Sequence, residues 1–332
     1  MAKSYGGTNT PGVIYCYDGK VPAADGSGCA AAGTTVLYSN GRLTGVGSSA
    51  GMTRYTGLDS MGRVSKYEQW VDGTAYPFVY GYLLGGQQSM VRYPSGREWS
   101  SEYSAAARPV SLANGGTAGA CAAPGCYASG VTYASHGGMV GGTFGPLVQR
   151  WSYNSRLQGT GLAVTMGGAA LWSMTNSFSA TSNNGNISGQ TVTASGAGGV
   201  NVTSTLAYDA LNRLTGVTEG GMSQTFGYDS VGNRWVSGGM NLSPFTPTTS
   251  AWFEAGTNRF ASGVTYDDAA STGPGNMTGL GNVTLEYDAE NRQKAATVGG
   301  VRTEYWYDGD GRRVKKRTGA GAAPVYVYEV GG

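Results

Sequence analysis

Charged side chains are scarce in this sequence. Asp, Glu, Lys and Arg make up 13% of the 332 residues, against about 25% in typical soluble domains. The net charge is only +2, and a nucleic-acid interface needs a broad basic patch, so we expect no nucleic-acid partner. The one basic cluster is predicted to be a polar hairpin face and consists of Arg312, Arg313, Lys315, Lys316 and Arg317.

Histidine is limited to His136, which stands among glycines. It has no cysteine or serine partner in a recognisable motif, so it supports neither a zinc site nor a Ser–His–Asp triad. Carboxylates are paired at Asp267 and Asp268 and at Asp308 and Asp310, and such pairs can perform glycosidase chemistry. Both pairs fall inside or beside a repeated turn motif, which accounts for them. We therefore expect no catalytic site, no metal and no cofactor.

Long apolar runs are also missing. No stretch approaches the roughly 18 apolar residues of a membrane-spanning helix, so no membrane span is expected. Residues 1–12 lack the apolar core of a signal peptide.

Cysteine is rare, and its four copies form two local pairs, Cys16 with Cys29 and Cys121 with Cys126. Short-range pairs in a chain rich in Gly, Ser and Thr predict disulfides that close loops in an oxidising compartment. An extracellular or cell-surface location follows. Because an exported protein needs a signal, we expect the chain to derive from a longer exported parent.

Glycine and tyrosine are abundant. The chain has 58 glycines and 22 tyrosines, but only 7 Phe and 7 Trp. With Thr, Val and Ser, these residues favour pleated strands joined by many tight turns. The hydrophobic fraction of 40% argues against bulk disorder.

A seven-residue motif that starts with Tyr-Asp recurs along the chain. Its tyrosines advance by 20 residues from 208 to 228, by 38 to 266, then by 21 and 20. Residues 252–260 are expected to hold a degraded repeat within the longest gap. Worn copies begin at Tyr38, Leu58, Tyr93 and Tyr153. The clearest copies supply the motif residues Tyr208, Asp209, Arg213, Tyr228, Asp229, Gly232, Arg234, Tyr287, Asp288, Arg292, Tyr307, Asp308, Gly311 and Arg312.

The spacing of the motif predicts β-hairpins. A repeat of about 20 residues is too short for a βαβ crossover but fits two strands of about six residues and two turns. In the motif, Asp can accept backbone N–H groups, and the Gly or Asn that follows can take a positive φ. Arg is expected to return to the Asp carboxylate of its own or a neighbouring repeat. Stacked repeats should place the tyrosines in a ladder, each ring packing on the next.

The motif resembles the YD repeats of the rearrangement-hotspot (Rhs) family, which are shared with the teneurins and the shell proteins of insecticidal toxin complexes. The resemblance covers most of the chain and is densest from about 201 to 332; the opening Val13-Ile-Tyr-Cys16-Tyr-Asp18-Gly also looks like bacterial members. It implies an antiparallel sheet that spirals into a hollow shell, which encloses a toxic C-terminal domain or serves as an adhesive surface. The family's Pro- and Asp-rich closing segment, linked to self-cleavage, is not found before Gly332, so we expect a segment of a shell.

The predicted fold is all-β, with tandem hairpin repeats of about 20 residues forming a spiralling antiparallel sheet, a partial YD-repeat shell or solenoid. Residues 1–332 are expected to form a single array. Degenerate repeats occupy 1–111, irregular Gly/Ala/Ser-rich repeats and loops occupy 112–200, and well-formed repeats occupy 201–332.

The function expected from these features is a non-enzymatic extracellular scaffold that encloses or presents a C-terminal cargo. Two alternatives stay open: a self-assembling filament subunit, because an array can leave open β edges, and an adhesin for glycans or protein partners. The expected partners are other segments of the parent protein or copies of this chain, with surface glycans also considered. Tryptophans that could stack on sugars, or pack across strands, are Trp70, Trp99, Trp151, Trp172, Trp235, Trp252 and Trp306.

Overall fold

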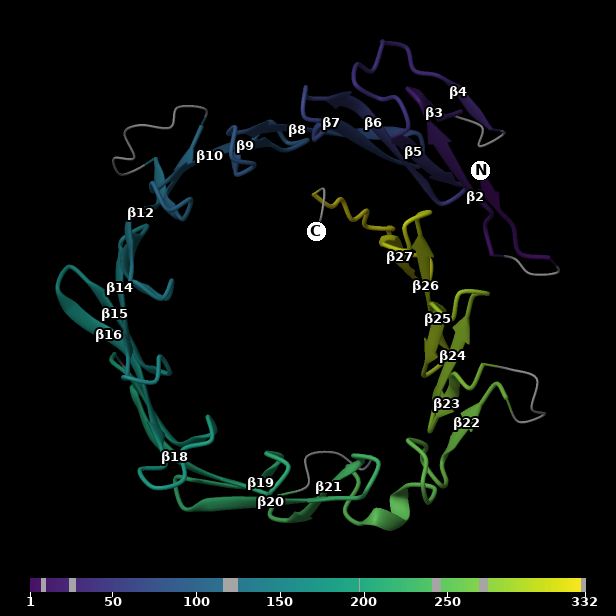
Figure 1. Ribbon diagram of the computed structural model, residues 1–332. Helices are drawn as coiled ribbons and strands as arrows, with labels where there is room; N and C mark the ends of the chain where they lie inside the picture. The colour runs from purple at the N-terminus through teal and green to yellow at the C-terminus, as the bar shows by residue number, and fades with distance from the viewer. Residues whose placement is uncertain are drawn as a thin grey trace. The chain divides into compact units, whose positions relative to one another are not determined.

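The computed structural model describes residues 1–6, 10–23, 28–115, 125–196, 198–240, 246–268 and 274–329. Within these residues the regular secondary structure consists of antiparallel β-strands and one 3-10 turn, η1 (Ser250–Trp252) (Figure 1). It divides into two compact units: unit 1 comprises Met1–Ser100 and Gly263–Gly332, and unit 2 comprises Ser101–Ser262. The predicted all-β fold of tandem hairpins is confirmed.

Unit 1 is built from strands of both ends of the sequence. The first part contributes β1 (Ala2–Lys3), β2 (Val13–Tyr17), β3 (Lys20–Pro22), β4 (Cys29–Ala31), β5 (Leu43–Ser48), β6 (Gly51–Leu58), β7 (Val64–Val71), β8 (Thr74–Tyr82) and β9 (Gln88–Arg92). The last part contributes β22 (Val264–Tyr266), β23 (Met277–Leu280), β24 (Val283–Tyr287), β25 (Gln293–Val298), β26 (Val301–Tyr307) and β27 (Arg313–Thr318). β10 (Glu98–Tyr103) begins in unit 1 and ends in unit 2.

Unit 2 holds consecutive hairpins. Its strands are β11 (Pro109–Asn114), β12 (Cys126–Tyr133), β13 (Met139–Phe144), β14 (Leu147–Tyr153), β15 (Gly159–Met166), β16 (Ala169–Phe178), β17 (Ile187–Ala194), β18 (Val200–Tyr208), β19 (Leu214–Glu219), β20 (Met222–Tyr228) and β21 (Arg234–Gly238). Strands β1, β2 and β5–β21 belong to a 19-stranded sheet, β22–β27 form a six-stranded sheet, and β3 pairs with β4.

Two kinds of turn alternate along the chain. The hairpin between β19 and β20 closes through Gly220 and Gly221, whose φ angles are 55° and 84°, and the hairpin between β25 and β26 closes through Gly299 and Gly300 at 55° and 80°. Two successive positive φ angles belong to type I′ turns, which match the twist of paired strands and favour glycine. The other ends of these strands carry the Tyr-Asp motif. One repeat is therefore a strand, a tight turn, a second strand and a motif turn.

The structure differs from expectation over 160–200, where irregular repeats and loops were predicted. This region holds three of the longer strands, β15, β16 and β17. The glycines that suggested a loop, Gly167 and Gly168, form only the tight turn between β15 and β16 and have φ angles of 57° and 85°. In β15 the small residues Gly161, Ala163 and Thr165 alternate with Leu162, Val164 and Met166, the period of a strand with one apolar face.

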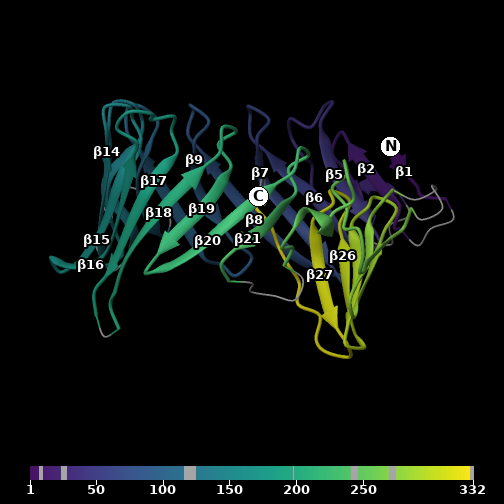
Figure 2. The ribbon, with the colours of Figure 1, turned by 90° about the horizontal axis from the view of Figure 1, so that it is seen from below.

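In unit 2 the apolar side chains gather on one face of the sheet. Trp151 lies opposite Leu162, Leu162 opposite Met174, Met174 opposite Val192, and Val192 opposite Val202. Residues opposite one another share a face, so these five form a continuous row, and all are half-buried. Figure 2 shows β17 to β21 side by side in this part of the sheet. The opposite face is rich in hydroxyl groups, such as the pair of Thr191 and Thr203 at 2.9 Å.

The core of unit 1 is a stack of aromatic rings between β7, β8 and β9. Tyr67, Phe78, Tyr80 and Val91 are between 0% and 3% exposed. Tyr67 and Phe78 are cross-strand partners whose ring centroids lie 4.9 Å apart and 4° from parallel. This cluster is where unit 1 buries its largest side chains.

The last strands of unit 1 pack against its first strands. Val314 of β27 and Ala295 of β25 are fully buried. A Cβ atom placed on Gly309 would lie 2.5 Å from Cγ1 of Val46 and 2.8 Å from Cγ1 of Val13. Only glycine therefore allows the turn after β26 to approach β2 and β5 so closely.

The disulfide predicted between Cys16 and Cys29 is present and ties β2 to the β3–β4 hairpin. Pro22 of this hairpin contacts the backbone of β5, and its carbonyl accepts a hydrogen bond from Arg54 at 2.7 Å. The second predicted pair lies outside the described residues because Cys121 is not among them; its expected partner Cys126 begins β12.

Candidate functional site

The Tyr-Asp motif forms a turn of constant geometry. At Asp209, Oδ1 accepts the backbone N–H groups of Leu211 and Arg213, both at 2.9 Å. The N–H of Asp209 donates to the carbonyl of Arg213, and the N–H of Asn212 donates back to the carbonyl of Asp209, each at 3.0 Å. The same carboxylate contacts recur at Asp59, Asp229, Asp288 and Asp308. The Asp residues of the motif thus shape the turn.

The third residue after Asp takes a positive φ. The angle is 62° at Asn212, 94° at Gly232, 59° at Asn291 and 82° at Gly311. Leu157 occupies the same position in a worn copy, with a φ of 62°. A leucine in this left-handed conformation is strained, because its Cβ crowds the following carbonyl.

Replacing Leu157 with glycine should therefore raise the free energy of unfolding by about 0.5–1 kcal/mol. Leu157 is 57% exposed, so little packing is lost. Urea titration of the full chain measures the change. The matched control is Leu84→Gly, since Leu84 is 91% exposed and has no positive φ. An equal gain in both variants would disprove the role of strain.

Arginine closes the turn in the best copies. Nε of Arg213 lies 2.7 Å from Oδ2 of Asp209, and Nε of Arg63 lies 2.6 Å from Oδ2 of Asp59. The backbone N–H of Arg213 and then its guanidinium hold the pKa of Asp209 below its usual value. The predicted Asp–Arg pairing is therefore present in these copies, within one repeat.

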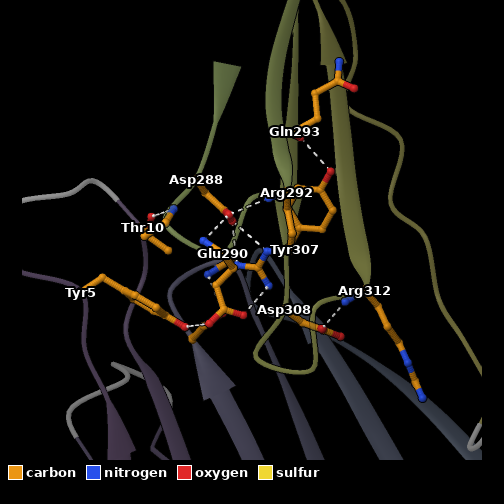
Figure 3. Close-up of polar contacts among 12 residues, drawn as sticks. Tyr5, Thr10, Asp288, Glu290, Arg292, Gln293, Tyr307, Asp308 and Arg312 are labelled. Atoms are coloured by element: carbon orange, nitrogen blue, oxygen red, sulfur yellow. Dashed lines mark hydrogen bonds and ion pairs between the residues drawn. The ribbon is translucent and has the colours of Figure 1, made fainter. Parts of the chain in front are cut away.

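Two copies depart from the predicted pairing. In the copy that begins at Tyr228, Asn233 stands four residues after Asp229, where other copies have arginine. It donates from Nδ2 to Oδ2 of Asp229 at 2.7 Å. Arg234, which we expected in this role, lies one residue later and its guanidinium covers the ring of Phe226. Strand alternation directs these successive residues to opposite sides, so the prediction for Arg234 was wrong. In the last copy Arg312 contacts the carboxylate of Asp308 through its backbone N–H and not through its guanidinium, and its side chain extends away (Figure 3).

The motif arginine also contacts the next repeat. Arg213 donates from Nη1 to the carbonyl of Asp229 at 3.1 Å, and its guanidinium lies 4.5 Å from the ring centroid of Tyr228. The hydroxyl of Tyr228 donates to the carbonyl of Leu214 at 2.7 Å. The arginine therefore joins the aspartate of its own turn to the tyrosine of the following one; we name this arrangement the Asp–Arg–Tyr clamp.

The Asp–Arg–Tyr clamp recurs in other repeats, including one worn copy of the motif. Arg63 covers the ring of Tyr82, which donates to the carbonyl of Val64 at 2.9 Å. Arg292 lies 2.7 Å from Asp288 and 5.0 Å from the ring of Tyr307 (Figure 3). In these three copies the tyrosine ring is covered by the arginine of the preceding repeat, so the motif tyrosines do not pack ring on ring from one repeat to the next as predicted. A cation placed over the face of a tyrosine is attracted by the ring quadrupole, which stabilises this arrangement.

Asp308 occupies a buried position in the last copy. Asp308 is only 4% exposed, and burial raises the pKa of its carboxyl above the ordinary value. The carboxylate accepts N–H groups from Asp310 at 3.0 Å and Arg312 at 2.9 Å. A proton binds more readily to Asp308 in the folded than in the unfolded chain, so its contribution to stability is complete at low pH and is lost as pH rises through the folded pKa.

Replacing Asp308 with asparagine should therefore raise the free energy of unfolding near pH 7, because the amide oxygen can accept both N–H groups without a buried charge. The difference from the parent chain should disappear as pH falls below the ordinary value of 3.8, where the carboxyl is neutral in both states. Urea titrations at pH 7, 5 and 3.5 measure this. A variant less stable than the parent at pH 7 would contradict it.

The other candidate residues have structural partners. Lys315 pairs with Asp72 at 2.8 Å and Arg317 with Glu304 at 2.6 Å, so these members of the basic cluster face carboxylates. His136 is exposed, and its ring edge contacts Tyr153.

The paired carboxylate at Asp267 also belongs to a turn. Its Oδ1 accepts the N–H groups of Gly275 and Asn276, both at 2.8 Å. Within the described ranges, no three His, Cys, Asp or Glu side chains cluster to hold a metal ion. Nor does that part of the chain contain a helix of the length and apolarity that a membrane crossing requires.

The tryptophans are half-buried without exception. Trp70 donates to Glu68 at 2.8 Å and its ring is covered by Arg54 at 4.6 Å. Trp151 packs against Phe144 with ring centroids 6.1 Å apart. These contacts accord with cross-strand packing, and glycan binding stays a prediction.

Solved structures share this fold. The chain aligns with one chain of a TcdB2-TccC3-Cdc42 crystal structure with a TM-score of 0.64 at 14% identity, over 83% of this chain and 16% of that one. A TcdB2-TccC3 crystal structure gives 0.55, and the Tc holotoxin pore of Photorhabdus luminescens gives 0.53, at the same identity and coverage. This likeness shows the fold and supports its YD-repeat type. No protein-family profile and no curated protein matches the chain.

Proposed function

We propose that this chain is a structural scaffold without enzymatic activity, a segment of a YD-repeat shell that encloses or presents a C-terminal cargo. The observation that carries this proposal is the Asp–Arg–Tyr clamp. The polar residues that recur most regularly hold one motif turn to the next, as Asp209 and Arg213 do. Such side chains are then not available as acids, bases or ligands, which favours a mechanical role.

The apolar face of unit 2 supports the enclosing role. The row from Trp151 to Val202 is half-buried, so part of each apolar side chain stays accessible on this face. A sheet with one apolar and one hydroxyl-rich face suits contact with polypeptide on the apolar side. The partners proposed are therefore other segments of the parent protein, cargo included, or copies of this chain.

An extracellular location belongs to the same proposal. The disulfide between Cys16 and Cys29 supports it, because such bonds persist in oxidising compartments. One solved structure with this fold is the Tc holotoxin pore of Photorhabdus luminescens, and this chain spans 16% of the chain that it matches there. The cargo and the export route are thus part of the proposal.

Protease protection tests the enclosing role. A short unstructured polypeptide fused after Gly332 should be cut much more slowly than the same polypeptide added in trans to the full chain. The matched control carries Arg213→Ala and Arg292→Ala, which remove two clamps and should restore cleavage. Equal cleavage of the fused and the free polypeptide would reject enclosure. Electron microscopy separates the alternative: discrete particles accord with a shell segment, and continuous fibres favour the filament subunit.

A further inference from the structure

The segment Pro324–Glu329 follows β27 and contacts it through one isolated β-bridge. Val325 forms an antiparallel bridge with Lys315, and the N–H of Tyr326 donates to the carbonyl of Val314 at 2.9 Å. Tyr328 donates from its hydroxyl to the carbonyl of Arg313 at 2.6 Å. The hydroxyl contact of Tyr328 is the same as the one that Tyr228 makes to the carbonyl of Leu214 in an earlier repeat.

The side chain of Gln69 makes backbone hydrogen bonds to this segment that a neighbouring strand would otherwise make. Its Nε2 donates to the carbonyl of Tyr326 at 2.9 Å, and its Oε1 accepts the N–H of Tyr328 at 3.0 Å. An amide side chain offers the same donor and acceptor as a peptide group. Gln69 is 3% exposed and projects from β7, which fixes its position. The Gln69 amide therefore binds the backbone of an extended segment and does not depend on its side chains.

Two side chains of the segment add selectivity. Val327 is 38% exposed and lines a cavity together with Tyr76, Tyr93, Pro94 and Arg97. The carboxylate of Glu329 accepts a hydrogen bond from the hydroxyl of Tyr93. The apolar side chain of Val327 and the carboxylate of Glu329 thus meet complementary groups beside the backbone hydrogen bonds of Gln69.

The connection to this segment is exposed and built from small residues. Residues 319–322 have the sequence Gly-Ala-Gly-Ala and are all exposed, and Gly319 has a φ of 55°. The N–H of Gly319 donates to the carbonyl of Arg302 at 2.8 Å, which holds the start of the connection to β26. The small side chains that follow add little packing that would oppose release of the segment. Any copy of the segment presents the same backbone and side chains to Gln69.

We propose that Gln69, Tyr76, Tyr93 and Arg97, beside β27, form a binding site for an extended peptide with an apolar residue two positions before an acidic one. The site takes Pro324–Glu329 from its own chain or from a second copy of this chain. Exchange between copies buries the same surfaces at the cost of opening one connection, which is the physical basis of domain swapping. The site thereby links copies end to end.

Binding of a labelled peptide with the sequence of residues 322–329 tests the site. The receptor is the full chain carrying Val327→Asp, which unseats its own segment. Fluorescence anisotropy should rise to saturation, with an affinity at least tenfold above that of the parent chain, whose site is occupied. Adding Gln69→Ala to this receptor should weaken binding at least tenfold. A control peptide with Val327→Asp and Glu329→Lys should not bind.

Light scattering of the parent chain tests the exchange. Copies should associate with rising concentration, and Gln69→Ala should abolish the association while the circular dichroism stays that of a β-sheet. No saturable peptide binding by the folded Val327→Asp chain, or equal binding of the control peptide, would overturn the site. Peptide binding by a parent chain that stays monomeric would overturn the exchange between copies.

Discussion

Replacing Asp288 with alanine is expected to lower the free energy of unfolding of unit 1 by about 3 kcal/mol. The carboxylate of Asp288 accepts the N–H groups of Glu290 at 2.9 Å and Arg292 at 3.0 Å, and it pairs with the guanidinium of Arg292 at 2.7 Å. The side chains of Asp288 and Arg292 are only 8% and 18% exposed. Alanine would leave two N–H groups and a largely buried cation without their acceptor. Urea titration of the full chain provides the measurement.

The control for this prediction is Asp72→Asn. Asp72 pairs with Lys315 at 2.8 Å, but its side chain is 61% exposed, and asparagine also tolerates the positive φ of this position. Exposed pairs contribute little, so the change should stay below about 1 kcal/mol. If both variants lost the same stability, the buried clamp would have no special weight.

Replacing Phe78 with alanine is expected to cost unit 1 about 3–5 kcal/mol, because it opens a cavity in a close-packed core. Phe78 is 1% exposed, stacks on Tyr67 at 4.9 Å and meets the ring of Tyr93 edge-on at 5.9 Å. Scanning calorimetry of the full chain should show the earliest transition shifted to lower temperature.

Phe144→Ala in unit 2 is the matched control. Phe144 is half-buried and touches Trp151 at a centroid distance of 6.1 Å, so its removal should cost about 1–2 kcal/mol. Comparable losses at Phe78 and Phe144 would mean that the aromatic stack is not the core of unit 1.

The local part of the fold could be predicted from the sequence. Turn chemistry acts over a few residues, so the spacing of Asp209, Asn212 and Arg213 was enough to predict an Asx-turn with a positive φ and an ion pair. The same logic misjudged Arg234, because strand alternation makes Asn233 the partner of Asp229. Counting four residues from each Asp, rather than looking for the nearest arginine, would have identified Asn233.

The packing between repeats was harder to predict. A period of 20 residues shows which side chains recur but not which of them touch, so a ladder of tyrosines and an alternation of Arg and Tyr fit the sequence equally well. The geometry decides for the second: Arg213 covers Tyr228, and the tyrosine hydroxyl is bound by the backbone of Leu214.

Contacts between distant parts of unit 1 carried no signal in the sequence. Gln69 and Tyr326 are 257 residues apart and belong to no shared motif. Gly309 lies in the motif turn of its repeat, but its lack of a side chain is required by Val13 and Val46 from the other end of the chain. Such constraints arise only once the strands are placed.

A double-mutant cycle between Arg213 and Tyr228 tests most directly whether the motif holds neighbouring repeats together. Arg213→Ala, Tyr228→Leu and the double variant are compared with the parent chain by urea titration. The guanidinium lies 4.5 Å from the ring, so the clamp predicts a coupling free energy of about 1 kcal/mol. Losses that add to within about 0.3 kcal/mol would contradict it, because independent residues show no coupling.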